Sequence, residues 1–304
     1  MTPKDAIICL DIGGTNCRIG LVTEAMELCR RDNYSTAELS EKGFARELVR
    51  RLRAYIAKAE GFRIRAVALG VPATVDLDRR IVLQASNIEG LEDLAICDLL
   101  EKELGLPAYL EKDVNLLLLY DIESLKPESR NVLIGIYFGT GIGNSIYVHG
   151  RLLAGKNGVS GELGHVPQMH AHTKCGCGNE NCLETLGGGK RLSELAETVF
   201  ADTPIRELYL RHADHPLIRE QVEAMAIAVA TEVNILDPSC VILGGGLLQM
   251  PGFPKDFFEE KIKAYTRKPY PAENLSLLYS RPDQDNGILG AGYYGWKCFK
   301  EASH

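Results

Sequence analysis

Long apolar segments are missing from this 304-residue chain. No run approaches the roughly 18 residues that a membrane-spanning helix requires. The opening segment, MTPKDAIICLDIGG, lacks the basic start of a secretion signal, and Asp11 interrupts its only apolar stretch. We therefore expect a cytoplasmic protein with no membrane partner.

An excess of basic charge is also missing. The chain carries 34 Lys and Arg residues against 41 Asp and Glu residues, which gives a formal net charge of −7. This balance provides no general attraction to phosphate backbones, so we expect no nucleic-acid partner. The 45% apolar and 25% charged residues are ordinary for a globular protein and argue against disorder or fibrous repeats.

Two segments share one pattern of apolar run, glycine-rich turn and second apolar run. The first, AIICLDIGGTNCRIGLV, begins at Ala6, and the second, NVLIGIYFGTGIGNSIYVHG, begins at Asn131. Each pattern predicts a β-hairpin, and its repetition indicates a duplicated α/β fold with a cleft between two halves. We place the domains at 1–125 and 126–304, with Pro127 near the boundary.

The remaining patterns alternate helices with buried strands. Apolar residues at four-residue spacing predict a helix over about 41–60. Strands are expected at 66–71, 108–110 and 240–243. Further helices are expected at 94–104, from 114, at 191–200, at 217–236 and at about 287–304, and the last of these could pack back on the N-terminal domain.

The glycine-rich turns are candidate phosphate sites. Glycines let backbone N–H groups approach an anion closely, and a threonine hydroxyl adds a donor. A plain hairpin turn is the alternative for each, but two such turns in one chain favour binding. Neither turn matches a P-loop, and neither opens a helix as a dinucleotide fingerprint would.

A third glycine cluster follows the strand CVIL, at a strand end of the kind where α/β proteins bind ligands. A strand-to-helix turn is again the alternative. The candidate nucleotide-binding residues of the three clusters are Asp11, Gly13, Gly14, Thr15, Gly139, Thr140, Gly141, Gly143, Gly244, Gly245 and Gly246.

Three of the nine cysteines are clustered, in the segment 165–182. Cys175, Cys177 and Cys182, with His165 upstream, offer three thiolates and one imidazole. Such a set closes a tetrahedral Zn²⁺ site and leaves no open position, which indicates a structural metal. His170 and His172 compete with His165 as the nitrogen ligand. We expect the six scattered cysteines to be reduced thiols.

Several polar residues could handle a sugar hydroxyl. Asp113 follows a short strand and opens a helix, so it is either a general base directed into the cleft or a simple helix cap. Glu162 and Glu184 flank the zinc segment and could equally be surface charges. With His165 and Asn87 they form a set suited to the many directional hydrogen bonds of a sugar.

These motifs together resemble the ROK family of sugar kinases and sugar-responsive repressors, within the actin/hexokinase-like fold, also called ribonuclease H-like. DIGGT, GVPATVD, KDVN, FGTGIG, GELGH, CGCGNENCLE and ILGGG occur in the family's order. The resemblance implies ATP with Mg²⁺ as phosphoryl donor, structural Zn²⁺, a hexose substrate and a homodimer. It implies Asp113 as catalytic base and Asn87, Glu162, His165 and Glu184 as sugar contacts, so that His165 would serve both zinc and sugar.

One departure concerns the residue before the catalytic aspartate. Most glucokinase-like members carry asparagine there, touching the sugar's C3 and C4 hydroxyls, whereas this chain has Lys112. The loop GVPATVD also lacks the usual second glycine. The segment KDVNLLLLYD looks most like the D-allose kinase branch, and allose differs from glucose only at C3. Glucose or N-acetylmannosamine remains an alternative substrate, and a sugar sensor without turnover is the alternative of another class.

Only ten residues precede Asp11, which leaves no room there for a DNA-binding head and argues against a repressor.

Overall fold

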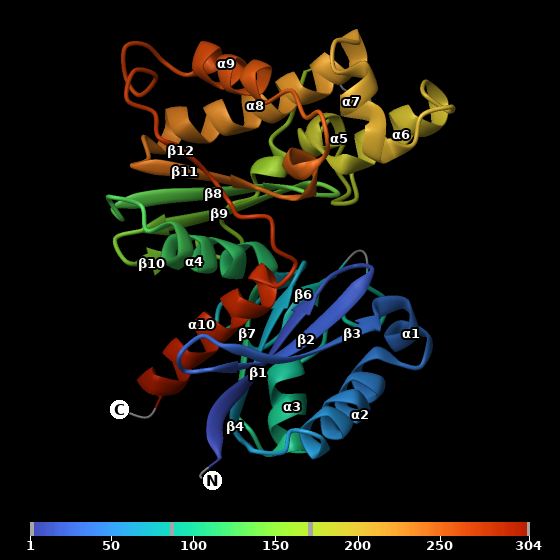
Figure 1. Ribbon diagram of the computed structural model, residues 1–304, viewed down its shortest axis with the longest axis vertical. Helices are drawn as coiled ribbons and strands as arrows, with labels where there is room; N and C mark the ends of the chain where they lie inside the picture. Colours follow the sequence, from blue (N-terminus) through green and yellow to red (C-terminus); the bar gives the residue numbers. More distant parts are fainter. Residues whose placement is uncertain (1–2, 86–87, 170–172, 303–304) are drawn as a thin grey trace. The chain divides into compact units, whose positions relative to one another are not determined.

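The computed structural model describes residues 3–85, 88–169 and 173–302. The chain divides into two compact units (Figure 1). The first comprises Met1–Ser124, Ala154–Val159 and Asp283–His304, and the second comprises Leu125–Leu153 and Ser160–Pro282. The predicted C-terminal domain of 126–304 thus differs from the second unit, because two of its pieces belong to the first.

The first unit is built on a five-stranded sheet of order β3-β2-β1-β4-β7. The pairs β1·β2 and β2·β3 are antiparallel, whereas β1·β4 and β4·β7 are parallel. Both faces of β1 are buried, as its apolar run Ala6–Leu10 requires. The strands are β1 (Lys4–Ile12), β2 (Asn16–Thr23), β3 (Leu28–Ser35), β4 (Phe62–Val71) and β7 (Ala108–Lys112); β5 (Thr74–Val75) and β6 (Val82–Gln84) form a small separate hairpin.

Helices cover both faces of this sheet. Ile8 and Leu10 of β1 pack in the core formed with α2 and α3, while Ile7 and Cys9 pack in the core formed with α4 and α10. This alternation follows from the two-residue period of a strand. The helices are α1 (Thr36–Glu41), α2 (Phe44–Ala57), α3 (Ile96–Leu104), α4 (Asp113–Leu125) and α10 (Asn286–Glu301).

The predicted helix over about 41–60 is α2, which begins slightly later and ends slightly earlier than expected, at Phe44 and Ala57. The chain turns at Gly43, whose φ is +84°, between α1 and α2. Only glycine takes this conformation readily, which explains why the helix begins after position 43 and not at 41.

The second unit repeats the plan of the first, which confirms the duplicated α/β fold. Its sheet has the order β10-β9-β8-β11-β12, with two antiparallel pairs followed by two parallel pairs. Figure 1 shows α8 and α9 on one face of this sheet. The elements are β8 (Val132–Phe138), β9 (Ile142–Val148), β10 (Arg151–Leu152), β11 (Cys240–Gly244), β12 (Leu277–Tyr279), η1 (Leu163–His165), α5 (Glu184–Gly187), α6 (Gly189–Thr198), η2 (Ile205–Glu207), α7 (Leu208–His212), α8 (Pro216–Leu236), η3 (Gly246–Gln249) and α9 (Lys255–Tyr265).

Helix α10 packs on the first sheet through its glycines. A Cβ at position 290 would collide with the carbonyl oxygen of Leu116 on α4, and one at position 292 would lie 2.6 Å from Val22 Cγ1. The four glycines of this segment therefore allow a closer approach to the sheet and to α4 than larger residues would, at some cost in helix propensity.

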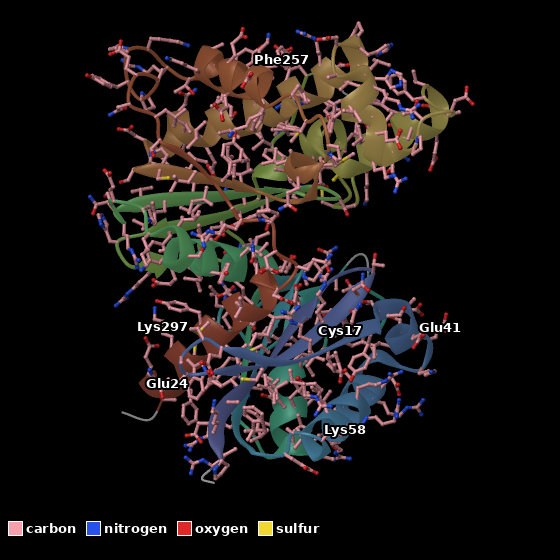
Figure 2. All side chains as sticks on the ribbon, in the orientation of Figure 1. Cys17, Glu24, Glu41, Lys58, Phe257 and Lys297 are labelled. Atoms are coloured by element: carbon pink, nitrogen blue, oxygen red, sulfur yellow. The ribbon has the colours of Figure 1, made fainter. Side chains whose placement is uncertain are left out.

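All nine cysteines are free thiols. Cys17 on β2, labelled in Figure 2, is fully buried in the first core. Burial raises the pKa of its thiol to about 12, so it is an unreactive core residue. Within the described ranges, no helix is both long enough and apolar enough to cross a bilayer.

Candidate functional site

The carboxyl ends of three parallel strands bring acidic residues to one edge of the first sheet. In the register of β1 and β4, Asp11 lies beside Gly70, and in that of β4 and β7, Val71 lies beside Lys112. Asp113 follows Lys112 directly. This edge is where open α/β sheets bind their ligands.

Asp113 opens α4 close to the end of β4. A Cβ at Gly70 would lie 3.5 Å from the Cα of Asp113 and 2.7 Å from Leu116 Cδ1, so glycine is what allows the helix to begin here. The Oδ1 atom of Asp113 accepts the N–H of Val114 at 2.8 Å. This bond to the next residue is not the cap of the second or third helical N–H that the capping alternative supposed, and it leaves the other carboxylate oxygen unused.

The surroundings of Asp113 raise its pKa to about 6. Burial is the largest cause, followed by the negative charge of Asp11, while the N–H of Val114 and the positive charge of Lys112 oppose the rise. A carboxyl group with this pKa is mostly ionised at pH 7 and binds a proton more tightly than an exposed aspartate does. Both properties suit a general base.

Asp11 is held between an arginine and a helix. Arg18 Nη1 donates to its Oδ2 at 3.1 Å, and a Cβ at Gly287, in the first turn of α10, would lie 2.5 Å from its Cγ. Burial raises the pKa of Asp11 although Arg18 opposes the rise. The carboxylate is therefore fixed in place at the sheet edge.

The first glycine turn, Gly13 to Thr15, joins β1 to β2. Gly13 donates its N–H to the carbonyl of Asn16 at 2.8 Å, and its own carbonyl accepts the hydroxyl of Thr36 at 2.7 Å. Gly14 and Thr15 are exposed. The turn is thus a rigid hairpin with two residues open to a ligand.

The second glycine turn joins β8 to β9 and packs on the start of α6. The N–H of Gly189 donates to the carbonyl of Gly139 at 2.9 Å, and that of Lys190 donates to the carbonyl of Thr140 at 3.0 Å. Gly143 lies within β9 and is not part of the turn. Its place on a strand separates it from the other candidates of this cluster.

The second turn and the third glycine cluster line one cavity of about 620 Å³. Gly245 has φ +98°, and a Cβ there would collide with the backbone of Phe138, so glycine is required at this position. The size is typical of a small-molecule site. Its lining residues are Gly139, Thr140, Gly189, Lys190, Leu192, Ser193, Glu194, Glu197, Ile205, Arg206, Gly246, Leu247 and Met250.

Much of the cavity wall was not predicted from the sequence. Lys190, Ser193, Glu194 and Glu197 lie on α6 and contribute polar groups beside the two glycine clusters. A helical pattern does not distinguish a ligand-facing polar residue from a solvated one, so the sequence carried no signal for them.

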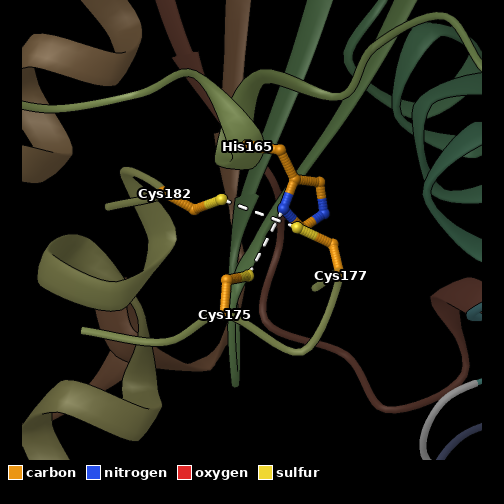
Figure 3. Close-up of side chains that lie close together, drawn as sticks. All are labelled: His165, Cys175, Cys177 and Cys182. Atoms are coloured by element: carbon orange, nitrogen blue, oxygen red, sulfur yellow. Dashed lines mark hydrogen bonds between the residues drawn. The ribbon is translucent and has the colours of Figure 1, made fainter. Parts of the chain in front are cut away.

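Figure 3 shows that the four predicted zinc ligands converge. The Sγ of Cys175 lies 3.5 Å from His165 Nδ1, and the two sulfurs of Cys177 and Cys182 lie 3.6 Å apart. All four candidate ligand atoms lie within 4.8 Å of one another. In a zinc tetrahedron the edges are about 3.6 Å between N and S and about 3.8 Å between two sulfurs, as the metal–ligand bond lengths require. The residues therefore fit zinc, while His170 and His172 lie outside the described residues.

The carboxylates that flank this segment lie beside the same histidine. Glu162 Oε2 is 3.6 Å from His165 Nε2, and Glu184 Oε1 is 3.9 Å from His165 Nδ1 and 3.1 Å from Cys175 Sγ. A Cβ at Gly141 would collide with the carboxylate of Glu184. The structure thus gathers Glu162, His165 and Glu184, whereas Asn87 lies outside the described residues.

Known proteins match nearly the whole chain. The glucokinase of Thermotoga maritima is 29% identical over 95% of this chain and 96% of its own length. The N-acetylmannosamine kinase of Salmonella arizonae is 26% identical over 93% of this chain and 96% of its own. A crystal structure of a ROK family glucokinase from Streptomyces griseus, in complex with glucose and AMPPNP, is 25% identical and has a TM-score of 0.78, covering 94% of this chain and 98% of that one.

The model of one protein family covers residues 7–295. This range includes both sheets except the first residues of β1, and it includes the three glycine clusters, Asp113 and the Cys/His cluster. The chain therefore belongs to the ROK family.

Proposed function

We propose that this protein transfers the terminal phosphoryl group of ATP to the 6-hydroxyl of an aldohexose, and that D-allose is its substrate. The general activity, ATP-dependent hexose phosphorylation, is supported by relatives that are named sugar kinases and by the related glucokinase complexed with glucose and AMPPNP. The choice of D-allose depends on the residues of this chain alone.

The observation that carries the kinase proposal is the position of Asp113. It lies at the carboxyl edge of the sheet, at the start of α4, with its pKa raised to about 6. As the sugar hydroxyl attacks the phosphorus, the O–P bond forms, the bond to ADP breaks, and the hydroxyl proton passes to the Asp113 carboxylate. Asp113 is therefore the general base in our proposal.

The nucleotide is assigned to the glycine clusters. In the second unit, the cavity beside Gly139, Thr140 and Gly246 would take the nucleoside. In the first unit, the turn at Gly13, Gly14 and Thr15 is a separate candidate for contacts with phosphate oxygens. Asp11 would supply the oxygen ligand that Mg²⁺ prefers, and the ion would neutralise part of the triphosphate charge.

Zinc is assigned a structural role at His165, Cys175, Cys177 and Cys182. Four protein ligands leave no position for water or substrate, so the ion would not act as a Lewis acid. With His165 Nδ1 turned to the sulfurs, Nε2 remains on the side of Glu162. The metal would thereby hold His165, Glu162 and Glu184 in place for sugar hydroxyls.

Lys112 carries the assignment of D-allose. Its side chain is buried, with only 7% exposed, and its charge lowers the pKa of the adjacent Asp113. An ammonium group here offers hydrogen-bond donors where family members with asparagine offer an amide. We propose that it selects the axial C3 hydroxyl of allose.

The decisive experiment compares kcat/KM for D-allose, D-glucose, D-mannose and N-acetylmannosamine, with ADP release as the readout. We expect kcat/KM for D-allose to exceed that for the others by at least about tenfold, since a buried hydrogen-bonding group left without its partner costs about 1–3 kcal/mol. Preference for glucose or N-acetylmannosamine would instead support the activities named for the relatives.

A sugar sensor without turnover would bind a hexose in calorimetry and release no ADP with any sugar. The oligomeric state is a separate proposal: we propose a homodimer, which sedimentation velocity would distinguish from a monomer of 33.4 kDa.

A further inference from the structure

A buried ion pair lies directly before the proposed catalytic base. Arg79 Nε donates to Glu111 Oε2 at 3.1 Å, and their side chains are 13% and 5% exposed. Arg79 belongs to the loop between β5 and β6, and Glu111 is the second-last residue of β7. Neither residue is assigned to the reaction above.

Glu111 contacts the chain on both sides of Asp113. Its Oε1 accepts the backbone N–H of Lys112 at 2.8 Å and the side-chain amide of Asn115 on α4 at 2.8 Å. The same carboxylate therefore joins the end of β7 to the first turn of α4. Asp113 lies within this junction, between Lys112 and Asn115.

Arg79 also contacts a distant part of the chain. Its Nη1 donates to the carbonyl oxygens of Asp76 and Gly158, each at 3.2 Å. Gly158 lies in Ala154–Val159, the segment that packs in the first unit although both its neighbours in sequence belong to the second. The chain continues from Gly158 to Glu162 within four residues.

The absence of a side chain at Gly158 allows the close approach of Arg79. Gly158 has φ +77°, and a Cβ there would lie 3.0 Å from Arg79 Nη1. Glycine thus leaves room for the guanidinium to reach the backbone. The guanidinium donates from two separate nitrogens in fixed directions, Nε to Glu111 and Nη1 to the backbone, whereas the donors of a lysine ammonium all lie on one atom.

We infer that Arg79 is a positioning residue for phosphoryl transfer: through Glu111 it orients the Lys112–Asp113 turn, and through Gly158 it anchors the segment that leads to Glu162. This inference rests on the proposed function. One side chain of the first unit would then hold both the start of the general-base helix and the segment Ala154–Val159, which precedes a proposed sugar contact in the chain. Loss of the guanidinium also leaves the buried Glu111 carboxylate without its partner.

The test compares Arg79→Met with Arg80→Met. Arg80 is the next residue of the same loop, and its guanidinium bonds Asp98 and Glu101 on α3 at 2.6 Å each. Both variants lose an arginine and its ion pairs, but only the first loses the contacts with Glu111 and Gly158. The measurements are kcat, KM for hexose, KM for ATP and hydrogen–deuterium exchange of the backbone.

For Arg79→Met we expect kcat/KM for the hexose to fall about 10²-fold, the loss typical of a small misplacement of reacting groups. Both a lower kcat and a higher hexose KM should contribute, while KM for ATP stays within about twofold. Exchange should accelerate at residues 154–159. Arg80→Met should keep kcat/KM within about threefold and leave exchange at 154–159 unchanged.

Arg79→Lys separates the two contacts. A lysine restores a positive charge beside Glu111, so kcat should recover at least about tenfold relative to Arg79→Met, while hexose KM stays raised because Gly158 is no longer held. A purely structural arginine would change stability and the active fraction without this split between kcat and KM.

Equal kinetics and equal exchange in Arg79→Met and Arg80→Met would overturn the inference. If Arg79→Met does not fold, the double variant Arg79→Met/Glu111→Gln, which buries no unpaired charge, takes its place with the same expected loss. A wild-type protein that phosphorylates no hexose refutes the proposed function, yet the exchange of 154–159 still decides whether Arg79 anchors this segment.

Discussion

The pH dependence of turnover tests the role of Asp113 most directly. Its pKa is raised to about 6 by burial and by the charge of Asp11. Only the ionised carboxylate can accept the proton of the sugar hydroxyl. We therefore expect kcat to rise with pH through about 6 and to level off above about pH 7.

The size of the effect follows from this pKa. At pH 5, one unit below it, about a tenth of the carboxyl groups are ionised, so kcat should be about a tenth of its plateau value. At the ordinary aspartate pKa of 3.8 most groups would be ionised at pH 5, and kcat would hardly change. At pH 5, the kcat expected in the two cases differs by almost an order of magnitude.

Two neighbouring charges should move the midpoint in opposite directions. Asp11 raises the pKa of Asp113 and Lys112 lowers it. In a plot of kcat against pH, Asp11→Asn should therefore shift the midpoint of the rise to lower pH. Lys112→Met should shift it to higher pH. Both substitutions also change ligand binding. We therefore compare the pH at which kcat reaches half its plateau, and not the absolute value of kcat.

The assay measures sugar phosphate directly, by ³¹P NMR on quenched samples at saturating hexose and ATP, because coupling enzymes have pH profiles of their own. Asp113→Asn is the control: it keeps the shape of the side chain but accepts no proton, so kcat should fall at least about 10²-fold while hexose affinity persists. A kcat that stays constant from pH 5 to pH 8 would refute the reasoning. So would a midpoint that moves in the same direction in Asp11→Asn and Lys112→Met.

Three further changes have expected outcomes. Cys177→Ser should abolish stoichiometric zinc in elemental analysis and lower the thermal midpoint by about 4 °C or more, whereas full zinc occupancy would exclude Cys177 as a ligand. Gly141→Ala should displace Glu184 and raise hexose KM about tenfold, and an unchanged KM would mean that Glu184 does not contact the sugar. Gly290→Ala should collide with the carbonyl of Leu116 and destabilise the protein by about 1–3 kcal/mol in urea denaturation, and an unaltered midpoint would contradict the close packing of α10.

Features that depend on neighbours in sequence were predictable. The twin hairpins follow from alternating apolar residues around glycine turns, and the structure confirms the matching sheets. The Cys/His cluster was predictable because its four donors lie within one short segment and the required geometry allows few other chemistries. Family membership followed from the same local motifs.

Other features depend on residues far apart in the chain. The division of the chain into units is one of them, because Ala154–Val159 and Asp283–His304 pack with the first unit although the second unit flanks or precedes them in sequence. Part of the cavity wall comes from α6, whose polar residues form a site only where the helix meets Gly139, which follows β8, and Gly246, which opens η3.

The chemistry of Asp113 shows the same division. Its residue type and its place between a strand and a helix follow from the sequence. Its pKa of about 6 does not, because burial and the charge of Asp11 arise only when β1, β4 and β7 align their carboxyl ends. The contacts of Arg79 with Glu111 and Gly158 were likewise absent from any motif. Backbone conformation and periodicity are local properties that a sequence carries directly, whereas burial, charge–charge distances and shared hydrogen bonds exist only once the tertiary fold has brought distant residues together.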